Sequence, residues 1–187
     1  MKTEEIVKEV FDLYRTYGDA DYIGEPVSQI EHMVQAAQLA EAAGYDDEVI
    51  LAAFFHDIGH ICEMDGQVEK MGLYGVKSHE EIGSKFLREK GFSRKICQLV
   101  ENHVAAKRYL TFVDESYYNK LSEASKKTLE YQGGRMTAEE AAAFKRDPLF
   151  EPSIALRYWD EEAKLQNQPM PPLSHFEEMA VRHLLKT

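Results

Sequence analysis

The sequence predicts an all-α protein, and three observations support this fold class. Apolar residues recur at helical spacing in successive segments, and glycines, prolines and N-capping residues bound these segments. No segment shows the alternation of apolar and polar residues that is typical of a half-buried strand, and there is no internal repeat. A chain of 187 residues is long enough for one sizeable core but short for two. We therefore expect residues 1–187 to form a single helical domain.

The composition limits the class of protein further. A net charge of −11 with 44% hydrophobic residues favours a soluble globular protein and argues against a general surface for nucleic acid or anionic membranes. Any basic binding site therefore has to be local. Cys62 and Cys97 are the only cysteines, and the chain has no signal-like or membrane-spanning stretch, so we expect a cytoplasmic protein with two buried structural thiols.

Two helices are expected before residue 45. Residues 4–17 carry apolar side chains at helical spacing, and Gly18 ends this segment. A second helix is expected over residues 26–43, with proline at its first position and Gly44 as its stop. This helix places His32 among apolar residues. An isolated histidine there would be a satisfied core residue, so its role depends on what the next helix brings beside it.

The third predicted helix is an apolar run that abruptly carries three polar ligating groups. Asp46 or Asp47 can cap it, and it continues through His56 and Asp57 to His60. Each buried polar group costs about 1–3 kcal/mol when it is left unpaired, so these side chains need partners. In a continuous helix His56 and His60 share one face, while Asp57 lies about 100° away. Two metal ions bridged by the carboxylate would satisfy this arrangement.

The following segments place two more histidines near helix ends. Residues 71–78 form a glycine-containing loop before a helix that ends near Gly91, and His79 lies in the first turn of that helix. Ser93 caps the next helix, which carries His103. A first helical turn is a good place for a ligand and a poor one for a core residue.

The last third of the chain shows further helix signals. Lys107 and Arg108 either belong to a solvated face or form an anion site. The remaining helices are expected after Ser122, after a capping box at residues 137–140, over residues 152–164, and after a second capping box at residues 174–177.

Six residues match the ligand pattern of the HD-domain superfamily in its binuclear form: His32, His56, Asp57, His79, His103 and Asp160. The mononuclear form would not need His79 or His103. With Asp57 bridging, one ion has four protein ligands and the other has three, so open positions remain for catalysis. Imidazole and carboxylate ligands suit iron, manganese, zinc or cobalt. The cationic cluster favours an anionic or chelating substrate.

Most HD proteins hydrolyse phosphate esters, so a metal-dependent phosphohydrolase acting on a phosphate monoester or nucleotide is the alternative function. Four stretches point elsewhere, because they closely resemble the PhnZ type of HD-domain oxygenase. These stretches are DYIGE at residues 21–25, HVAAKRY at 103–109, LSEASKKTLEYQGG at 121–134 and LRYWD at 156–160. The resemblance extends over almost the whole chain and is far more specific than the His-Asp pair alone.

The resemblance implies a mixed-valent Fe(II)/Fe(III) pair that uses O2 to cleave a carbon–phosphorus bond. The implied substrate is a small 1-hydroxy-2-aminoethylphosphonate or its N-trimethyl analogue, and the products are phosphate and glycine or glycine betaine. It also implies that the six residues above are the iron ligands, and that Tyr22 occupies a coordination site at rest and gives way to the substrate. The partners would be an organophosphonate and O2, with the oligomeric state left open.

The substrate contacts are assigned by charge. The donors that could surround a phosphonate are His60, Lys107, Ser125, Gln132 and Arg157. Simpler interpretations stay open for several of them: Ser125 as a helix cap, Gln132 as a loop residue and His60 as a residue that orients the cluster.

The amine end of the substrate is less well defined. Glu25 is a candidate acceptor for a substrate ammonium, and its alternative is a surface acid near a helix start. A primary ammonium donates hydrogen bonds, whereas a quaternary one prefers aromatic faces. The aromatic residues available for the latter are Tyr22, Tyr74, Tyr109, Tyr158 and Trp159. Both substrates stay open, with the primary amine favoured.

Overall fold

The computed structural model describes residues 2–22, 24–66 and 78–187. Within these ranges no strand is present, and the only β pairing is an isolated bridge between Asp21 and Ser28. The all-α prediction is therefore confirmed. The loop expected at residues 71–78 lies, apart from Ser78, outside the described residues. The helices, in chain order, are α1 (Thr3–Tyr17), α2 (Gln29–Ala42), α3 (Asp47–Phe55), α4 (Ile58–Met64), α5 (His79–Glu89), α6 (Arg94–Val113), α7 (Glu115–Lys120), α8 (Glu123–Tyr131), α9 (Ala138–Phe144), α10 (Phe150–Glu162) and α11 (Leu173–Leu184).

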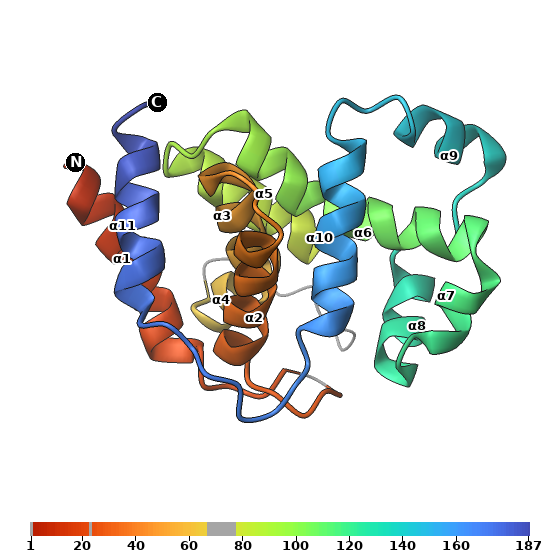
Figure 1. The fold of residues 1–187 in the computed structure, drawn as a ribbon, viewed down its shortest axis with the longest axis horizontal. Helices are drawn as coiled ribbons and strands as arrows, with labels where there is room; N and C mark the ends of the chain where they lie inside the picture. The colour runs from red at the N-terminus through yellow and green to blue at the C-terminus, as the bar shows by residue number, and fades with distance from the viewer. Residues whose placement is uncertain (1, 23, 67–77) are drawn as a thin grey trace.

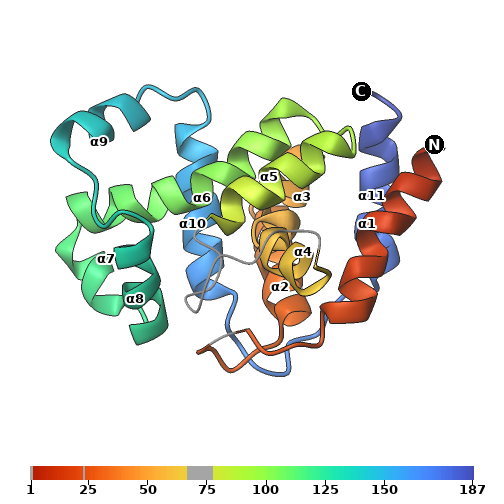
Figure 2. The same ribbon diagram turned by 180° about the vertical axis from the view of Figure 1, so that it is seen from behind.

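The helices are arranged in three groups along the longest axis of the molecule (Figure 1). The N-terminal α1 and the C-terminal α11 pack side by side at one end. The middle contains α2, α3 and α4, with α5 and the long α6 on the face seen from behind (Figure 2) and α10 packed against both α2 and α6. Helices α7, α8 and α9 lie at the other end. Every helix expected to carry a metal ligand therefore passes through the middle group.

Two hydrophobic clusters hold these groups together. The larger one joins α1, α2, α3, α5, α10 and α11, and four of its largest fully buried side chains are Phe11, Phe54, Phe55 and Phe176. The smaller cluster lies at the α7–α9 end. Helix α6 contributes to both, because its first half packs in the larger cluster and its second half in the smaller one. As predicted, both cysteines are buried, and burial raises the pKa of Cys62 to about 12.

Most helix boundaries agree with the capping signals. Ser93, Ser122 and Thr137 each accept a hydrogen bond from a backbone N–H in the first turn of the helix that they precede, and Thr137 forms the predicted capping box. Asp46, the first of the two candidates, caps α3.

Three boundary predictions are wrong. Helix α2 begins at Gln29 rather than at residue 26, because Ser28 forms a capping box with Glu31 and the chain before it makes a turn closed by a hydrogen bond from the Glu25 N–H to the Tyr22 carbonyl. The capping box expected at residues 174–177 is not formed, since Pro172 takes the N-cap position with extended backbone and the helix begins at once. Helix α7 was not expected; Asp114 caps it directly after α6 ends.

None of the helices in the described ranges combines the length and the apolar character that a membrane span requires.

Candidate metal centre

His56 and Asp57 lie at a break between α3 and α4. The sequence predicted one continuous helix through this point, and this is wrong: Asp57 has φ −105° and ψ 14°, outside the helical range, and α4 starts at the next residue. The argument from helix phase therefore does not apply. Gly59, in the first turn of α4, allows a close approach of α5, because a Cβ at this position would lie 1.9 Å from the His79 carbonyl oxygen. The backbones of α4 and α5 meet at Gly59, which brings His79 beside Asp57.

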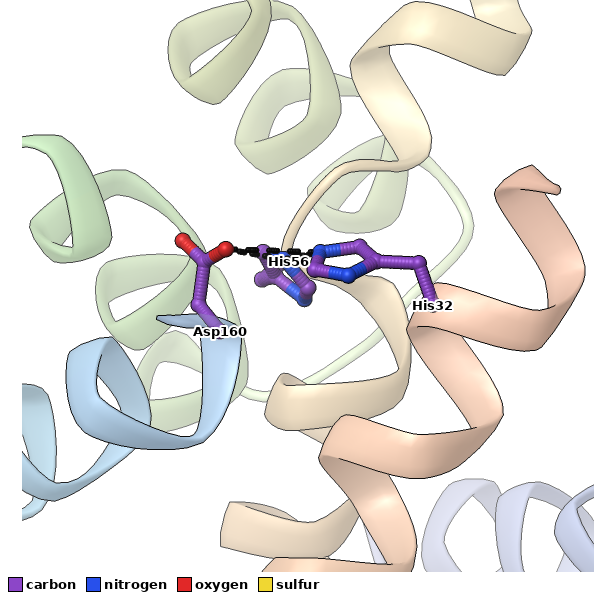
Figure 3. Close-up of side chains that lie close together, drawn as sticks. All are labelled: His32, His56 and Asp160. Atoms are coloured by element: carbon purple, nitrogen blue, oxygen red, sulfur yellow. Dashed lines mark hydrogen bonds and ion pairs between the residues drawn. The ribbon is translucent and has the colours of Figure 1, made fainter. Parts of the chain in front are cut away.

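One group of donor atoms comes from α2, α10 and the α3–α4 break (Figure 3). The Nε2 atoms of His32 and His56 are 3.0 Å apart, and His32 Nε2 is 3.3 Å from Asp160 Oδ1. Asp57 Oδ2 lies 3.6 Å from His32 Nε2 and 3.4 Å from His56 Nε2. All four side chains are buried.

The second group uses the other oxygen of Asp57. Asp57 Oδ1 is 3.2 Å from His79 Nε2 and 3.4 Å from His103 Nε2, and these two nitrogens are 3.0 Å apart. His60 approaches this group from α4, because its ring stacks on that of His79 with a centroid distance of 4.1 Å. One oxygen of the Asp57 carboxylate thus faces the first donor group, and the other oxygen faces the second.

The spacing of these atoms fits two metal ions. Two cis ligands that are each about 2.1 Å from one ion lie roughly 3.0 Å from each other. The Nδ1 atoms of His32, His56 and His103 are 2.8, 2.7 and 2.5 Å from the backbone carbonyl oxygens of Ala163, Ala53 and Val100. With a proton on Nδ1, the Nε2 lone pairs of two neutral imidazoles at 3.0 Å repel each other unless a proton or a metal cation lies between them.

The electrostatics of the cluster also favour a cation. Burial opposes ionisation of both Asp57 and Asp160. Even so, the charge of His56 holds the pKa of Asp57 well below its ordinary range, and the charge of Arg157 does the same for the pKa of Asp160. Burial opposes charge on His56 as well, but Asp57 and Asp160 raise its pKa to about 10. Burial and the neighbouring His60 lower the pKa of His79 to about 3. The cluster therefore contains two ionised carboxylates, the neutral imidazole of His79, and a proton held strongly on His56 where a metal cation would lie.

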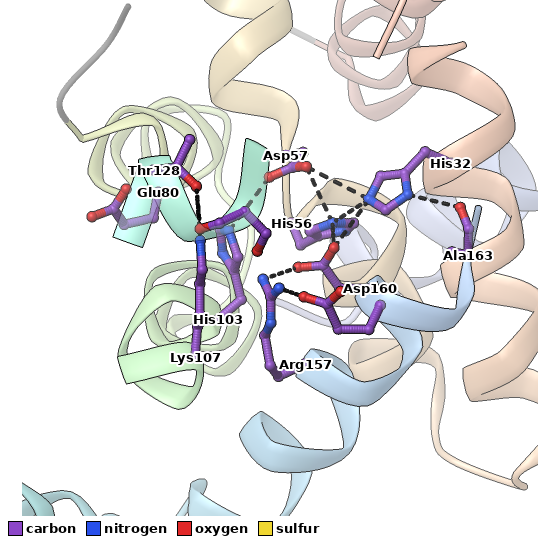
Figure 4. A network of polar contacts seen from close by, with 12 residues as sticks. His32, His56, Asp57, Glu80, His103, Lys107, Thr128, Arg157, Asp160 and Ala163 are labelled. Carbon is purple, nitrogen blue, oxygen red and sulfur yellow. Dashed lines mark hydrogen bonds and ion pairs between the residues drawn. The ribbon is translucent and has the colours of Figure 1, made fainter. Parts of the chain in front are cut away.

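Arg157 orients the candidate ligand Asp160 from one turn earlier on α10 (Figure 4). Its guanidinium donates to Asp160 Oδ2, the oxygen that faces away from His32, and it also pairs with Glu161. Its Nε donates to the Tyr117 hydroxyl at 2.8 Å. Two of its five N–H donors are thus already used in hydrogen bonds, and Glu161 balances its charge, which suits a residue that positions the Asp160 carboxylate.

A pocket of about 820 Å³ opens onto the cluster from the side of α8. Asp57, His79, His103 and Asp160 form part of its wall. The seven residues expected to contact the substrate all line this pocket: Tyr22, Glu25, His60, Lys107, Ser125, Gln132 and Arg157. The structure thus brings these residues together, and their roles in binding stay predictions.

Tyr22 is the pocket residue nearest to the first donor group. Its ring stacks on His32 with a centroid distance of 4.1 Å, and its hydroxyl donates to Asp57 Oδ2 at 2.8 Å. Burial and the charge of Asp57 raise the pKa of this phenol well above its ordinary value. The phenol therefore lies at the bridging carboxylate, next to the space in which the first ion would be held.

Lys107 lies deeper on the α6 wall and is only 3% exposed. Its ammonium donates to Thr128 Oγ1 at 2.8 Å and to Gln132 Oε1 at 3.1 Å, both from α8 and its C-cap. Burial and the nearby charge of Arg157 lower the pKa of Lys107 to about 7. The other cation of this sequence pair, Arg108, instead binds Glu140 and the Gly134 carbonyl outside the pocket.

The aromatic residues considered for a quaternary ammonium are mostly elsewhere. Tyr109 packs on Phe144 in the smaller hydrophobic cluster, and Trp159 packs on Tyr45. Tyr158 is 42% exposed and does not line the pocket. Tyr74 lies outside the described residues.

Sequence reasoning missed several residues of the pocket. Lys164 and Gln29 line it, and Thr128 shares the ammonium of Lys107. A signal existed for Lys164, which follows the candidate ligand Asp160 by four residues, just after α10 ends. Gln29 carried no such signal, because its polar side chain is indistinguishable in sequence from a solvated helix start.

Comparison with known proteins identifies the family. Residues 30–146 match the HD domain. The chain is 44% identical to an uncharacterized protein of Acanthamoeba polyphaga mimivirus over 95% of its length and 81% of that protein. It is 40% identical to the [1-hydroxy-2-(trimethylamino)ethyl]phosphonate dioxygenase (glycine-betaine-forming) of Leisingera caerulea, over 95% of the chain and 89% of the relative. It is also 37% identical to the hydroxymethylphosphonate dioxygenase of Gimesia maris, over 92% and 85% of the two chains. The chain therefore belongs to the HD-domain family, in the group that contains phosphonate dioxygenases.

Proposed function

We propose that this protein is an oxygenase that uses O2 and two iron ions to cleave the carbon–phosphorus bond of a small 1-hydroxyphosphonate, with release of phosphate. The observation that carries the proposal is the pair of donor groups that share Asp57 and open onto a pocket containing Lys107. The two dioxygenase relatives, similar over nearly the whole chain, support the same reaction class.

The reaction favours a redox-active metal, and we propose iron among those that the donor set suits. The donor set of imidazoles and carboxylates, without thiolates, suits several divalent metals. Zinc has no redox chemistry, so a dioxygenase needs a metal that changes its oxidation state. We propose a mixed-valent Fe(II)/Fe(III) pair, which would supply the redox chemistry for O2 and open positions for the substrate. His32, His56 and Asp160 would hold one ion, His79 and His103 the other, and Asp57 both.

The residues around the pocket would bind the two charged ends of the substrate. Lys107 would donate to the phosphonate, and Thr128 and Gln132 already hold its ammonium at the pocket wall. Ser125 lines the same wall. His60 would add a donor near the second ion, since burial opposes its charge but Glu63 and Asp57 raise its pKa above the ordinary value. These charge-assisted contacts are roughly twice as strong as neutral hydrogen bonds.

Arg157 and Tyr22 would act at the first ion. Arg157 would keep Asp160 aligned while its positive charge attracts the phosphonate into the pocket. The Tyr22 phenol would hold the place of the substrate hydroxyl at Asp57 until the substrate arrives, because it already donates to the same carboxylate.

The test is a turnover assay with the iron-loaded protein. Hydroxymethylphosphonate, 2-amino-1-hydroxyethylphosphonate and its N-trimethyl analogue are incubated with and without O2, and phosphate and the carbon product are quantified. We expect phosphate release from at least one of them only when iron and O2 are both present. Phosphate release from phosphate esters under argon, with manganese or cobalt, and none from the phosphonates would instead identify a phosphohydrolase and contradict the proposal.

A further inference from the structure

Lys164 forms a partly buried ion pair with Glu25 in the wall of the pocket. Its ammonium lies 3.1 Å from Glu25 Oε1 and 3.0 Å from Glu161 Oε2. The side chains of Lys164 and Glu25 are only 15% and 12% exposed. A partly buried ion pair is screened less than one on the open surface, so the charge of Lys164 affects any cation that approaches Glu25.

Both partners are held firmly in place. The residues that flank Lys164 are bonded to α2: the Ala163 carbonyl accepts from His32, and Leu165 exchanges two hydrogen bonds with the Gln35 amide. Glu25 is held by the Ser122 hydroxyl, which donates to Oε1 at 2.8 Å. Lys164 therefore meets Glu25 because the fold positions both, and not through a chance contact of two long surface side chains.

The same pocket contains a second acceptor that Lys164 does not satisfy. Gln29 is 2% exposed, and its Nε2 donates to the Asp21 carbonyl, which fixes the orientation of the amide. Its Oε1 receives no hydrogen bond from the described residues. A buried acceptor of this kind costs free energy until a donor reaches it. A primary ammonium carries three N–H donors, whereas a trimethylammonium carries none.

We propose that Lys164 determines substrate specificity at the substituent on carbon 2 of the phosphonate. In the free protein its ammonium occupies the face of Glu25 that a substrate ammonium would use, so a cationic substrate has to compete with it. Lys164 thereby lowers the preference of the pocket for ammonium-bearing phosphonates over amine-free ones. This inference rests on the proposed function, because it assumes that phosphonates are the ligands of the pocket.

The experiment measures binding and not turnover. Calorimetry under argon gives the Kd of the metal-loaded protein for 2-aminoethylphosphonate and for ethylphosphonate, which has the same length but no amine. The quantity of interest is the ratio of the ethylphosphonate Kd to the 2-aminoethylphosphonate Kd, compared with the change that Lys127→Met produces, because the two ligands differ in net charge and any loss of positive charge shifts the ratio somewhat. The variants are Lys164→Met, Glu25→Gln and the double variant. Lys127→Met is the matched control, since Lys127 also lines the pocket but is exposed.

We expect the ratio to rise threefold or more in Lys164→Met, to fall in Glu25→Gln, and to stay within threefold of the Glu25→Gln value in the double variant. Lys127→Met should leave it within threefold of the original. A ratio that changes less than threefold in Lys164→Met, or an equal rise with and without Glu25, would overturn the proposal. If Lys164→Met does not fold, as judged by circular dichroism, Lys164→Gln takes its place with the same thresholds. Failure of the proposed function is seen separately, as no O2-dependent phosphate release.

Discussion

At the scale of single residues, the centre depends on where protons lie. The Nδ1 atoms of His32, His56 and His103 face backbone carbonyls, so each Nε2 is free to bind a metal. Asp57 divides its two oxygens between the two donor groups. In the absence of metal, the carboxylates hold a proton on His56, whose pKa is raised to about 10. A metal ion has to displace that proton.

This gives a prediction for metal binding. Because the pKa of His56 lies near 10, the residue is protonated at pH 8 in the metal-free protein, and a bound metal needs it neutral. Fe(II) binding at pH 8 should therefore release at least one proton, and the affinity should fall as the pH is lowered. Titration calorimetry in two buffers of different ionisation enthalpy measures this number. Equal heats in both buffers would show that no proton is released and would contradict the proton placement.

A second prediction concerns Lys107. Hydrogen bonds to charged groups contribute about 1.5–3 kcal/mol, so Lys107→Met should weaken phosphonate binding by about 10- to 100-fold. Since the pKa of Lys107 is lowered to about 7, its charge is lost as the pH rises through 7, and binding to the original protein should weaken over that range. Lys107→Met should lack this component of the pH profile. Lys85→Met, on the exposed surface of α5, is the control. An unchanged Kd in Lys107→Met would remove this residue from the phosphonate site.

The six candidate ligands could be predicted because their order along the sequence resembles the HD-domain pattern, and the need of His56 and Asp57 for partners in an apolar run was visible without a structure. The same reasoning could not separate residues that bind substrate from those that bind each other. Arg157 was expected to contact phosphonate, yet much of its guanidinium is engaged by Asp160, Glu161 and Tyr117. Such contacts depend on side-chain geometry across helices, which sequence spacing does not contain.

At the scale of secondary structure elements, α8 connects the substrate pocket to the loop before α2. Ser122 caps α8 by accepting from the Ser125 N–H, and its hydroxyl donates to Glu25. Helix α8 in turn carries Ser125 and Thr128 into the pocket. The cap of this helix is therefore also a contact between two walls of the pocket.

Comparing two helix caps tests this connection. Loss of an N-cap side chain typically costs about 1 kcal/mol, so Ser122→Ala and Thr137→Ala should lower the stability by similar amounts. Thr137 caps α9 and does not line the pocket. We expect Ser122→Ala alone to change the Kd for 2-aminoethylphosphonate, measured by calorimetry, because it alone frees Glu25. The same Kd shift in both variants would indicate a general loss of stability instead.

The break between α3 and α4 shows a limit of prediction at this scale. Residues 47–64 contain no proline, and their apolar pattern favours one helix. The break becomes necessary only when α5 packs on Gly59 and His79 has to reach Asp57. A tertiary contact thus overrides local propensity, which the sequence pattern alone cannot reveal.

At the scale of the whole molecule, α6 joins the two hydrophobic clusters and carries His103 and Lys107 between them. We propose on this basis that residues 1–187 unfold as one domain. Calorimetry should give a single transition with equal calorimetric and van't Hoff enthalpies. Metal removal should lower its midpoint, since a ligand at 100 times its Kd stabilises by about 2.7 kcal/mol. Two separate transitions, or a midpoint that metal does not affect, would contradict this account.

The central claim is that six side chains from five segments hold two ions through the shared carboxylate of Asp57. The most direct test is anomalous scattering at the iron edge from crystals of the iron-loaded protein. The account predicts two peaks about 3.5–4 Å apart, one beside His32, His56 and Asp160 and one beside His79 and His103. His103→Ala should weaken or remove only the second peak. A single peak in the original protein, or none with these side chains in place, would contradict the claim.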